Sequence, residues 1–392
     1  MMNGKVAKIL NTKFEYIIFN MRRFPSLLII LFYSCFCYAQ SKEATLKILV
    51  DSLRIAGNFP GLSVAVYSDQ KNYSYTSGFA DPDKQIPLKT SDRLLQGSVG
   101  KTYAAAITLK LIKDGKINLD EKVSKYLGHH GWYGRIPNAA DITVRMIMNH
   151  TSGVMRYEFK DQFTRDLTAN HNKTWKPEDL LQYILDEEAS FPAGTGWEYS
   201  DTNFILLGMI IEQITGKKFY DLAKRELLQP FKLENTFPSD SRKLTGLVLG
   251  FAGEQNEFGG KDRVIGDDGL FIINPQFEWT GGGFYSSTED LAKWGKSLYE
   301  GKVVDTSLML HSAVPAKLGR DVKYGLGVII RQTPIGVAYG HSGFFPGYLT
   351  EMYYFPQYKM CVAVQANSSD FKKLKGSVLR CLVEVARLVM QE

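Results

Sequence analysis

The sequence predicts an α/β protein whose antiparallel sheet, flanked by helices, is built from both ends of the chain around an inserted, mainly helical domain. Two strand-like runs lie near the amino end, at residues 62–67 and 73–78. Three or four more lie near the carboxyl end, and the residues between have helical and loop-rich patterns. We therefore assign residues 40–105 and 280–392 to the sheet domain and residues 106–279 to the helical domain.

The first forty residues have the features of an export signal. A basic start at residues 21–23 precedes an almost wholly apolar run at residues 24–36. Cys37 and Ala39 then place small residues at the two positions that signal peptidase reads. We therefore expect residues 1–39 to be a signal peptide and the mature protein to be periplasmic or secreted.

Alternatives for this segment stay open. The apolar run is too short for a comfortable membrane span, so we expect no stable span after processing, with an uncleaved anchor as the alternative. A lipid anchor on Cys35 or Cys37 is weakly supported, because bulky residues precede Cys35. If translation starts at Met21, residues 1–20 are a wrongly assigned extension of the sequence.

Composition and charge indicate an ordinary globular protein. The 392 residues are 44% hydrophobic and carry a net charge of +6. Residues 1–40 hold five Lys or Arg and one Asp or Glu, so the remaining chain has a charge of only +2. The charge balance thus gives no indication of a nucleic-acid partner. We expect Cys361 and Cys381 to be buried thiols, with a single bridge as the alternative.

Hydrophobic periodicity predicts the remaining elements in order. Residues 238–278 are glycine-rich and irregular, which indicates a surface excursion. The predicted helices cover residues 41–56, 98–115, 143–149, 177–185, 203–215, 219–228, 287–299 and 371–390, and the later strands cover 324–331, 336–340, 347–355 and 359–366.

An apolar run directly after Ser98 predicts a buried helix that ends at Gly115. Ser98 and Lys101 are three residues apart and so share one face of it. A lysine amine held against apolar surroundings is pushed toward its neutral form and can take a proton from serine. The pair is a candidate nucleophile and base, although a helix cap beside a lysine explains it equally well. The other Ser-x-x-Lys matches, at Ser68 and Ser369, lie in a polar turn and before a solvated basic helix.

Two later segments carry further candidates. Tyr199 lies just before a buried helix, where a phenol beside an amine can relay a proton, although a half-buried packed tyrosine is the commoner case. Residues 340–344 (Gly-His-Ser-Gly-Phe) interrupt a strand region, where glycine permits close approach of another backbone, such as that of a substrate. A β-bulge or hairpin is the alternative.

Together these segments resemble the serine β-lactamase and penicillin-binding-protein superfamily. The resemblance is closest to the branch of class C β-lactamases, D-Ala-D-Ala carboxypeptidases, D-aminopeptidases and related esterases. It covers about residues 46–390 and rests on three motifs in the family's order: residues 98–101 (Ser-Val-Gly-Lys), 199–201 (Tyr-Ser-Asp) and 341–343 (His-Ser-Gly). Accessory stretches at residues 149–153, 202–208 and 281–283 agree.

The resemblance implies a β-lactamase/transpeptidase-like fold and a covalent mechanism. Ser98 would attack a carbonyl and form an acyl-enzyme, with Lys101 and Tyr199 handling the proton. The backbone N–H groups of Ser98 and Phe344 would form the oxyanion hole. Water would then release the acid, and no metal or other cofactor is implied.

The second and third motifs depart from the usual family pattern. Asp201 stands where the family commonly has Asn, and a carboxylate there favours a protonated Lys101 and suits a substrate with a free amine. His341 replaces the Lys of typical β-lactamases, which removes a permanent charge that helps hold a substrate carboxylate. With Ser342 and Gly343, these residues are the candidate substrate-binding set, and the remaining histidines are interpreted as structural or exposed.

The leading prediction is an exported β-lactamase-related serine hydrolase that acts on D-amino-acid peptides, amides or esters. A class C-like β-lactamase is the nearest alternative. A non-catalytic relative that binds peptidoglycan fragments or assembles with itself is the other. In the first two cases the partner is a small molecule or peptide. The sequence does not decide the exact substrate or the oligomeric state.

Overall fold

The computed structural model describes residues 43–254, 256 and 261–390, so the predicted signal peptide lies outside the described residues. The chain forms two units, Met1–Leu49 and Val50–Glu392. In the first unit, residues 43–49 are described and are helical. All predicted site residues belong to the second unit.

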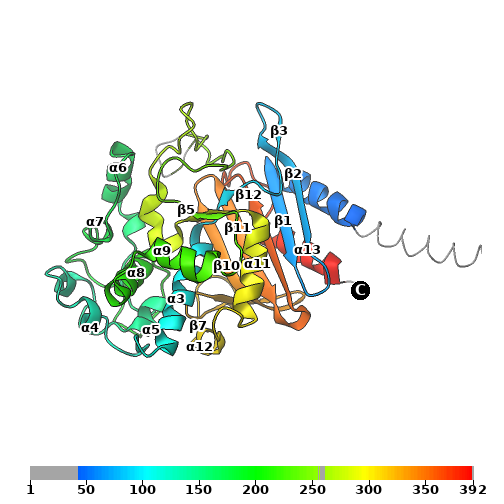
Figure 1. Cartoon of the computed structure of the whole chain (residues 1–392). Coiled ribbons are helices and arrows are strands. Elements are labelled where there is room, and N and C mark those ends of the chain that lie inside the picture. Colours follow the sequence, from blue (N-terminus) through cyan, green and yellow to red (C-terminus); the bar gives the residue numbers. More distant parts are fainter. Residues whose placement is uncertain (1–42, 255, 257–260, 391–392) are drawn as a thin grey trace, which may run out of the picture. The chain divides into compact units, whose positions relative to one another are not determined.

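Among the described residues, the second unit contains a nine-stranded antiparallel sheet (Figure 1). The strand order is β3-β2-β1-β12-β11-β10-β9-β8-β7, so β1 pairs with β12 and joins strands from the two ends of the chain. This confirms the predicted fold class. The strands are β1 (Gly61–Tyr67), β2 (Tyr73–Asp81), β3 (Ile86–Pro87), β7 (Val314–Pro315), β8 (Lys323–Tyr324), β9 (Ile329–Thr333), β10 (Gly336–Phe345), β11 (Tyr348–Phe355) and β12 (Met360–Ala366).

Helices cover both faces of the central strands, which explains why β1 and β12 are almost continuously apolar. Helix α11 (Thr288–Tyr299) contacts β1, β11 and β12, and α13 (Val378–Met390) contacts β11 and β12. Figure 1 shows α11 in front of the sheet and α13 behind it. Ser287 caps α11, as predicted, because its side chain accepts a hydrogen bond from the Asp290 N–H.

The middle of the chain is mainly helical and holds a short three-stranded sheet, β4-β6-β5. The predicted helix from Ser98 begins as a 3₁₀ turn, η1 (Gly97–Gly100), and continues as α3. The elements here are β4 (Leu94–Leu95), α3 (Lys101–Lys113), α4 (Ser124–Leu127), α5 (Val144–Met148), α6 (Asp161–Ala169), α7 (Pro177–Leu181), α8 (Asp201–Thr215), α9 (Phe219–Ala223), β5 (Thr236–Pro238), α10 (Trp279–Gly282) and β6 (Phe284–Ser286), with α12 (Ser307–His311) following α11.

Several predicted boundaries were wrong. The helix predicted at residues 177–185 ends at Leu181, and the strand predicted at 336–340 continues without interruption to Phe345. The last helix begins at Val378, not near residue 371, so Ser369 does not lie at its start. Instead, Ser369 is buried, and its hydroxyl accepts a hydrogen bond from the Gly347 N–H at 2.8 Å. The predicted strand at residues 324–331 is split into β8 and β9, because Gly327 adopts a φ of +74° between them.

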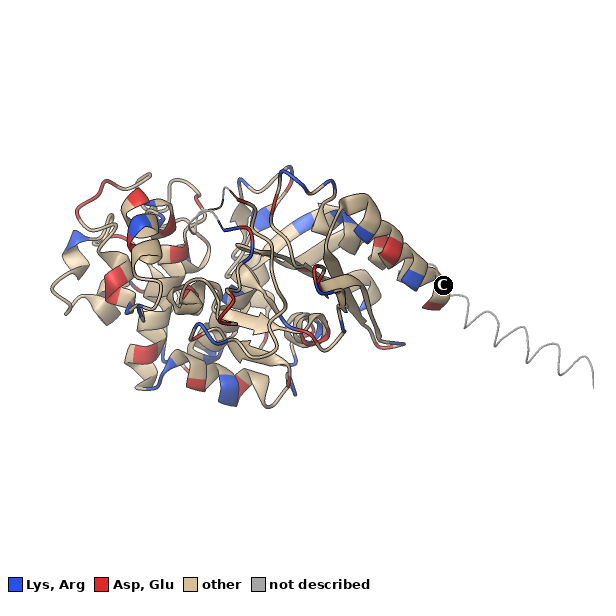
Figure 2. Cartoon of the chain, turned by 90° about the horizontal axis from the view of Figure 1, so that it is seen from above, with Lys and Arg blue, Asp and Glu red and all other residues tan. Residues whose placement is uncertain are grey.

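Cys361 and Cys381 are buried free thiols, as expected. In the part of the chain that the structure describes, no helix is both long enough and apolar enough to cross a bilayer. Figure 2 shows basic and acidic residues interspersed along the described elements.

Candidate active site

Ser98 and Lys101 are held together at the junction of η1 and α3. Lys101 Nζ donates a hydrogen bond of 3.0 Å to Ser98 Oγ. Lys101 is fully buried, whereas Ser98 is partly exposed and lines a cavity. The amine is therefore shielded from water while the hydroxyl remains accessible to a substrate.

Glycines allow β10 to approach the Ser98 turn closely. A Cβ on Gly97 would lie 2.7 Å from the Phe344 nitrogen, and Gly97 has a φ of +52°. A Cβ on Gly343 would lie 1.9 Å from the Gln96 carbonyl oxygen. Both distances are too short for a side chain, so only glycine permits this packing. It brings the Phe344 backbone next to the Ser98 turn, as the predicted oxyanion hole requires.

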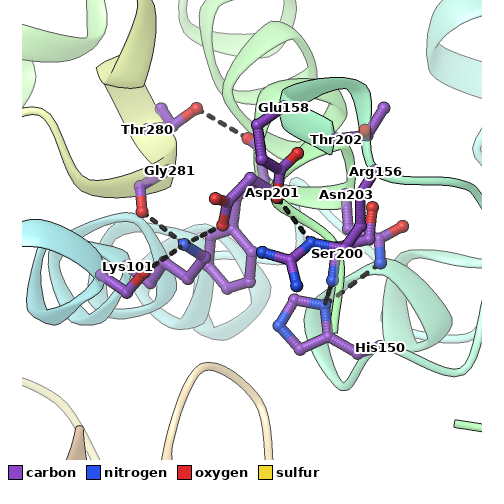
Figure 3. A network of polar contacts seen from close by, with 12 residues as sticks. Lys101, His150, Arg156, Glu158, Ser200, Asp201, Thr202, Asn203, Thr280 and Gly281 are labelled. Atoms are coloured by element: carbon purple, nitrogen blue, oxygen red, sulfur yellow. Dashed lines mark hydrogen bonds and ion pairs between the residues drawn. The ribbon is translucent and has the colours of Figure 1, made fainter. Parts of the chain in front are cut away.

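Figure 3 shows Lys101 Nζ reaching toward α10 and the first residue of α8. The amine donates a hydrogen bond to the Gly281 carbonyl and forms an ion pair with Asp201. With Ser98, three acceptors surround Nζ, which matches the three hydrogens of an ammonium. Burial raises the pKa of Asp201, but the charges of Lys101 and Arg156 outweigh it and hold that pKa below its usual value. Asp201 is therefore an ionised carboxylate.

The Tyr199 ring lies over the same amine, with Lys101 Nζ 4.9 Å from the ring centroid. Its hydroxyl oxygen is buried and makes no hydrogen bond of normal geometry with the described residues. Burial and the charge of Asp201 raise the pKa of Tyr199 well above its usual value, while the nearby Ser98 lowers it. The phenol is thus protonated at neutral pH and lies close to the predicted nucleophile.

His150 fixes the segment that carries Tyr199 (Figure 3). The Ser200 N–H donates to His150 Nδ1 at 3.3 Å, and Asn203 Nδ2 lies 3.2 Å from the same nitrogen. Burial lowers the pKa of His150 well below its usual value, so the ring is neutral. Its role is structural, in agreement with the interpretation from the sequence.

The third segment lies on β10, which continues as a regular strand through His341, Ser342 and Gly343. Among the described strands, β11 alone pairs with this half of β10, since the pairing of β9 with β10 ends at Gly340. His341 Nδ1 lies 2.6 Å from the Ser342 carbonyl oxygen, and its Nε2 lies 2.9 Å from Tyr324 Oη. Burial and the charge of Lys101 lower the pKa of His341 to about 3, so this position carries no positive charge near pH 7.

The three predicted segments meet at one cavity of about 540 Å³. Its wall contains all of the predicted site residues except Lys101, which lies behind Ser98. The members of the predicted set that line it are Ser98, Tyr199, Asp201, His341, Ser342, Gly343 and Phe344.

Further carboxyl groups line the cavity beside Asp201. Arg156 Nε donates a hydrogen bond of 2.7 Å to Glu158 Oε1. Burial and the charge of Asp201 raise the pKa of Glu158 to about 7 and that of Glu278 to about 8. The cavity therefore becomes more negative as the pH rises through this range.

Comparison with known proteins shows to which family the chain belongs. The profile of the Beta-lactamase family matches residues 46–378, most of the chain. The chain belongs to the Beta-lactamase family. The prediction of a β-lactamase-related serine hydrolase is confirmed at this level.

Among curated proteins, the chain is similar to penicillin-binding protein 4* of Bacillus subtilis (strain 168). The two are 24% identical over 353 residues, which are 87% of the chain and 75% of that protein. It is 27% identical to Protein flp of Staphylococcus aureus (strain N315) over 263 residues, which are 65% of the chain. The chain spans about half the length of Protein flp, 48%.

Solved structures share the fold. The D-amino acid amidase from Ochrobactrum anthropi SV3, complexed with D-phenylalanine, matches with a TM-score of 0.76 and 22% identity, over 90% of this chain and all of that one. The D-stereospecific amidohydrolase from Streptomyces sp. matches with a TM-score of 0.74 and 23% identity, over 87% of this chain and 97% of that one.

Sequence reasoning missed four charged residues of this Beta-lactamase family site: Arg156, Glu158, Glu278 and Glu351. The first three lie within a few residues of the accessory stretches, and that proximity was a usable signal. Glu351 lies directly opposite Ser342 in the β10–β11 pair. A hairpin with a two-residue turn at Pro346 and Gly347 would have indicated this pairing.

Proposed function

We propose that this protein hydrolyses amides or peptides of D-amino acids that carry a free amine, through an acyl-enzyme on Ser98. The observation that carries the proposal is the negative charge beside the nucleophile. The ionised Asp201 and the carboxyl groups of Glu158 and Glu278 line the cavity that Ser98 opens into. A substrate ammonium would be attracted to these groups, whereas an acylated amine carries no charge and would lose this attraction.

The proposed reaction has two halves. Ser98 Oγ attacks the amide carbonyl and passes its proton to the Lys101–Tyr199 pair, while the backbone N–H groups of Ser98 and Phe344 stabilise the oxyanion. The C–N bond then breaks, and the leaving amine takes a proton from the Lys101–Tyr199 pair. A water molecule attacks the ester, its proton returns to Ser98 Oγ, and the D-amino acid is released.

Asp201 links activation of Ser98 to binding of the substrate amine. In the free enzyme it forms an ion pair with Lys101, and the same amine donates a hydrogen bond to Ser98 Oγ. A substrate ammonium that contacts Asp201 competes for the same carboxylate and weakens its hold on Lys101. A free amine would therefore help to activate the nucleophile as well as bind the substrate.

The cavity wall also favours a large apolar side chain. Phe344 and Phe371 stack at its mouth with ring centroids 6.0 Å apart, and Phe159 lines it as well. The solved amidase from Ochrobactrum anthropi SV3 holds D-phenylalanine in one crystal and L-phenylalanine amide in another. We therefore take D-phenylalanine amide as the first substrate to test.

The test measures ammonia release from D-phenylalanine amide and labelling by a fluorescent fluorophosphonate. We expect turnover and labelling of the wild type, and Ser98→Ala should lose both, with kcat/KM lower by roughly 10⁴-fold or more. Faster hydrolysis of a chromogenic cephalosporin than of the amide would favour a β-lactamase. A protein that is neither labelled nor active would be a binding relative, and the proposal would be wrong.

We also propose that the protein is exported. This rests on the basic start, the apolar run and the small residues at Cys37 and Ala39 in the sequence.

A further inference from the structure

Ser342 and Glu351 form a fixed pair beside the nucleophile. They lie directly opposite each other in the antiparallel register of β10 and β11. Ser342 Oγ donates a hydrogen bond of 2.7 Å to Glu351 Oε2. Both residues line the same cavity as Ser98. Because two paired strands hold them, their contact does not depend on a mobile loop.

This pairing removes a donor from the substrate site. A serine hydroxyl has one hydrogen, and here Glu351 accepts it. Tyr353 Oη lies 3.2 Å from the same Ser342 oxygen. Towards a substrate, Ser342 therefore offers no free hydrogen, and the Glu351 carboxyl lies directly behind it.

The charges around the pair also oppose a substrate carboxylate. His341 is neutral, and Glu351 adds a negative charge when it is ionised. Arg331 is the cation that acts on Glu351, but its guanidinium lies 4.9 Å from the Tyr353 ring centroid and Arg331 is not part of the cavity wall. A carboxylate beside the pair would thus face a like charge, and the Ser342 hydroxyl would not donate to it.

We propose that Glu351 is a specificity-determining residue that excludes substrates whose leaving group carries a free carboxylate. The inference rests on the proposed function and deepens it. It assigns the enzyme to simple amides and to peptides with a blocked carboxyl end, and not to carboxypeptidase substrates. Glu351 acts here through charge and through its hold on Ser342, and it takes no part in the bond-breaking steps.

The test uses two dipeptides that differ only in the carboxylate, D-phenylalanyl-D-alanine and D-phenylalanyl-D-alanine amide. Burial raises the pKa of Glu351 to about 7, so the assays are run near pH 7.5, where most of this group is ionised and much of the substrate amine is still protonated. We expect the wild type to prefer the amide by about tenfold or more in kcat/KM. Glu351→Gln keeps the size and an acceptor for Ser342, and it should reduce this preference by about tenfold.

Controls separate charge from structure. Glu188→Gln removes an exposed carboxyl outside the cavity wall and should leave the preference unchanged. The same dipeptides are titrated against Ser98→Ala and Ser98→Ala/Glu351→Gln by calorimetry, so that binding is measured without turnover. The preference in Kd should appear in the first protein and shrink in the second.

Several results would overturn the inference. One is an equal kcat/KM or an equal Kd for the two dipeptides in a protein that keeps Glu351. Another is a preference for the amide that stays unchanged in Glu351→Gln. A wild type that favours the free acid, with that activity lost in Arg331→Gln, would assign a carboxylate site to Arg331 instead. Failure to bind either dipeptide would also count against it. Absent turnover of D-phenylalanine amide itself would instead show that the proposed function is wrong.

Discussion

At the scale of single residues, Asp201 acts on both of the proposed proton-transfer groups. It pairs with Lys101 and lies close enough to Tyr199 to raise the pKa of that phenol. Neither the amine nor the phenol is therefore a ready base before a substrate binds. An asparagine would lack this charge and would leave the site equally suited to acylated and free amines.

The first prediction concerns Asp201→Asn. We expect the ratio of kcat/KM for D-phenylalanine amide over its N-acetyl derivative to fall by about tenfold, because the ion pair with the substrate ammonium is lost. Steady-state rates with both substrates measure the ratio. The exposed Glu188→Gln substitution is the control and should not change it. A wild type that prefers the acetylated substrate would contradict the role given to Asp201.

The second prediction concerns the loss of folding stability that the buried Glu278 carboxyl causes at alkaline pH. Burial raises the pKa of Glu278 to about 8 from 4.5. Between these two values the unfolded chain loses the proton and the folded chain keeps it, so stability falls as the pH rises through this window. Glu278→Gln lacks this loss, and we expect it to be more stable than the wild type by about 3 kcal/mol at pH 8.5.

Urea unfolding at pH 4.5 and pH 8.5 measures this difference. The advantage of Glu278→Gln over the wild type should be small at pH 4.5, where the carboxyl is protonated in the folded state and still about half protonated in the unfolded chain. An advantage of equal size at both pH values would mean that the change acts through packing and not through ionisation.

At the scale of elements, the site depends on close contacts between backbones. The η1 turn packs against β10 on one side and α10 on the other. A Cβ on Gly100 would lie 2.9 Å from Gly282 Cα, and a Cβ on Gly343 would lie 1.9 Å from the Gln96 carbonyl oxygen. Small residues at these positions therefore set where the Ser98 hydroxyl lies relative to the strand.

The third prediction is that Gly343→Ala displaces η1 from β10. A shift of this kind misplaces the nucleophile relative to the oxyanion donors, so we expect kcat/KM for D-phenylalanine amide to fall by about 100-fold. Gly134→Ala is the matched control, since a Cβ at that position meets nothing within 4 Å. Wild-type activity in Gly343→Ala would show that the strand position does not control the site.

Elements with a strong local pattern could be predicted from the sequence, whereas those set by distant contacts could not. The apolar run after Lys101 and the Gly216 stop after α8 define their helices locally. α13 starts later than the sequence predicts, and the Ser369 hydroxyl before it accepts a hydrogen bond from the distant Gly347 N–H, a contact that no local pattern indicates. The Ser98 motif could be located from the sequence for the same reason, because it lies at the start of one helix.

At the scale of the whole molecule, the site is assembled by the sheet. The pairing of β1 with β12 joins strands that lie about three hundred residues apart, and β10 and β11 continue the same sheet toward the cavity. The carboxyl groups of Glu158, Glu278 and Glu351 come from three separate segments. Their shared cavity follows from this assembly, so sequence spacing alone could not have predicted it.

The last prediction concerns the proposed export of the chain. We expect signal peptidase to cut after Ala39, so that the mature protein begins at Gln40. Removing the basic start also changes the net charge from +6 to about +2, which makes the mature chain nearly neutral. Intact-mass measurement of the protein from the periplasm or medium checks the cut site.

Ala39→Arg tests the same step, because a long charged side chain does not suit the position that the peptidase reads. This variant should accumulate uncut in the membrane fraction and retain activity on D-phenylalanine amide, since residue 39 precedes the family match at residues 46–378. A mature chain that begins with an acylated cysteine would support the lipid-anchored alternative. Full-length protein in the cytosol would contradict export in either form.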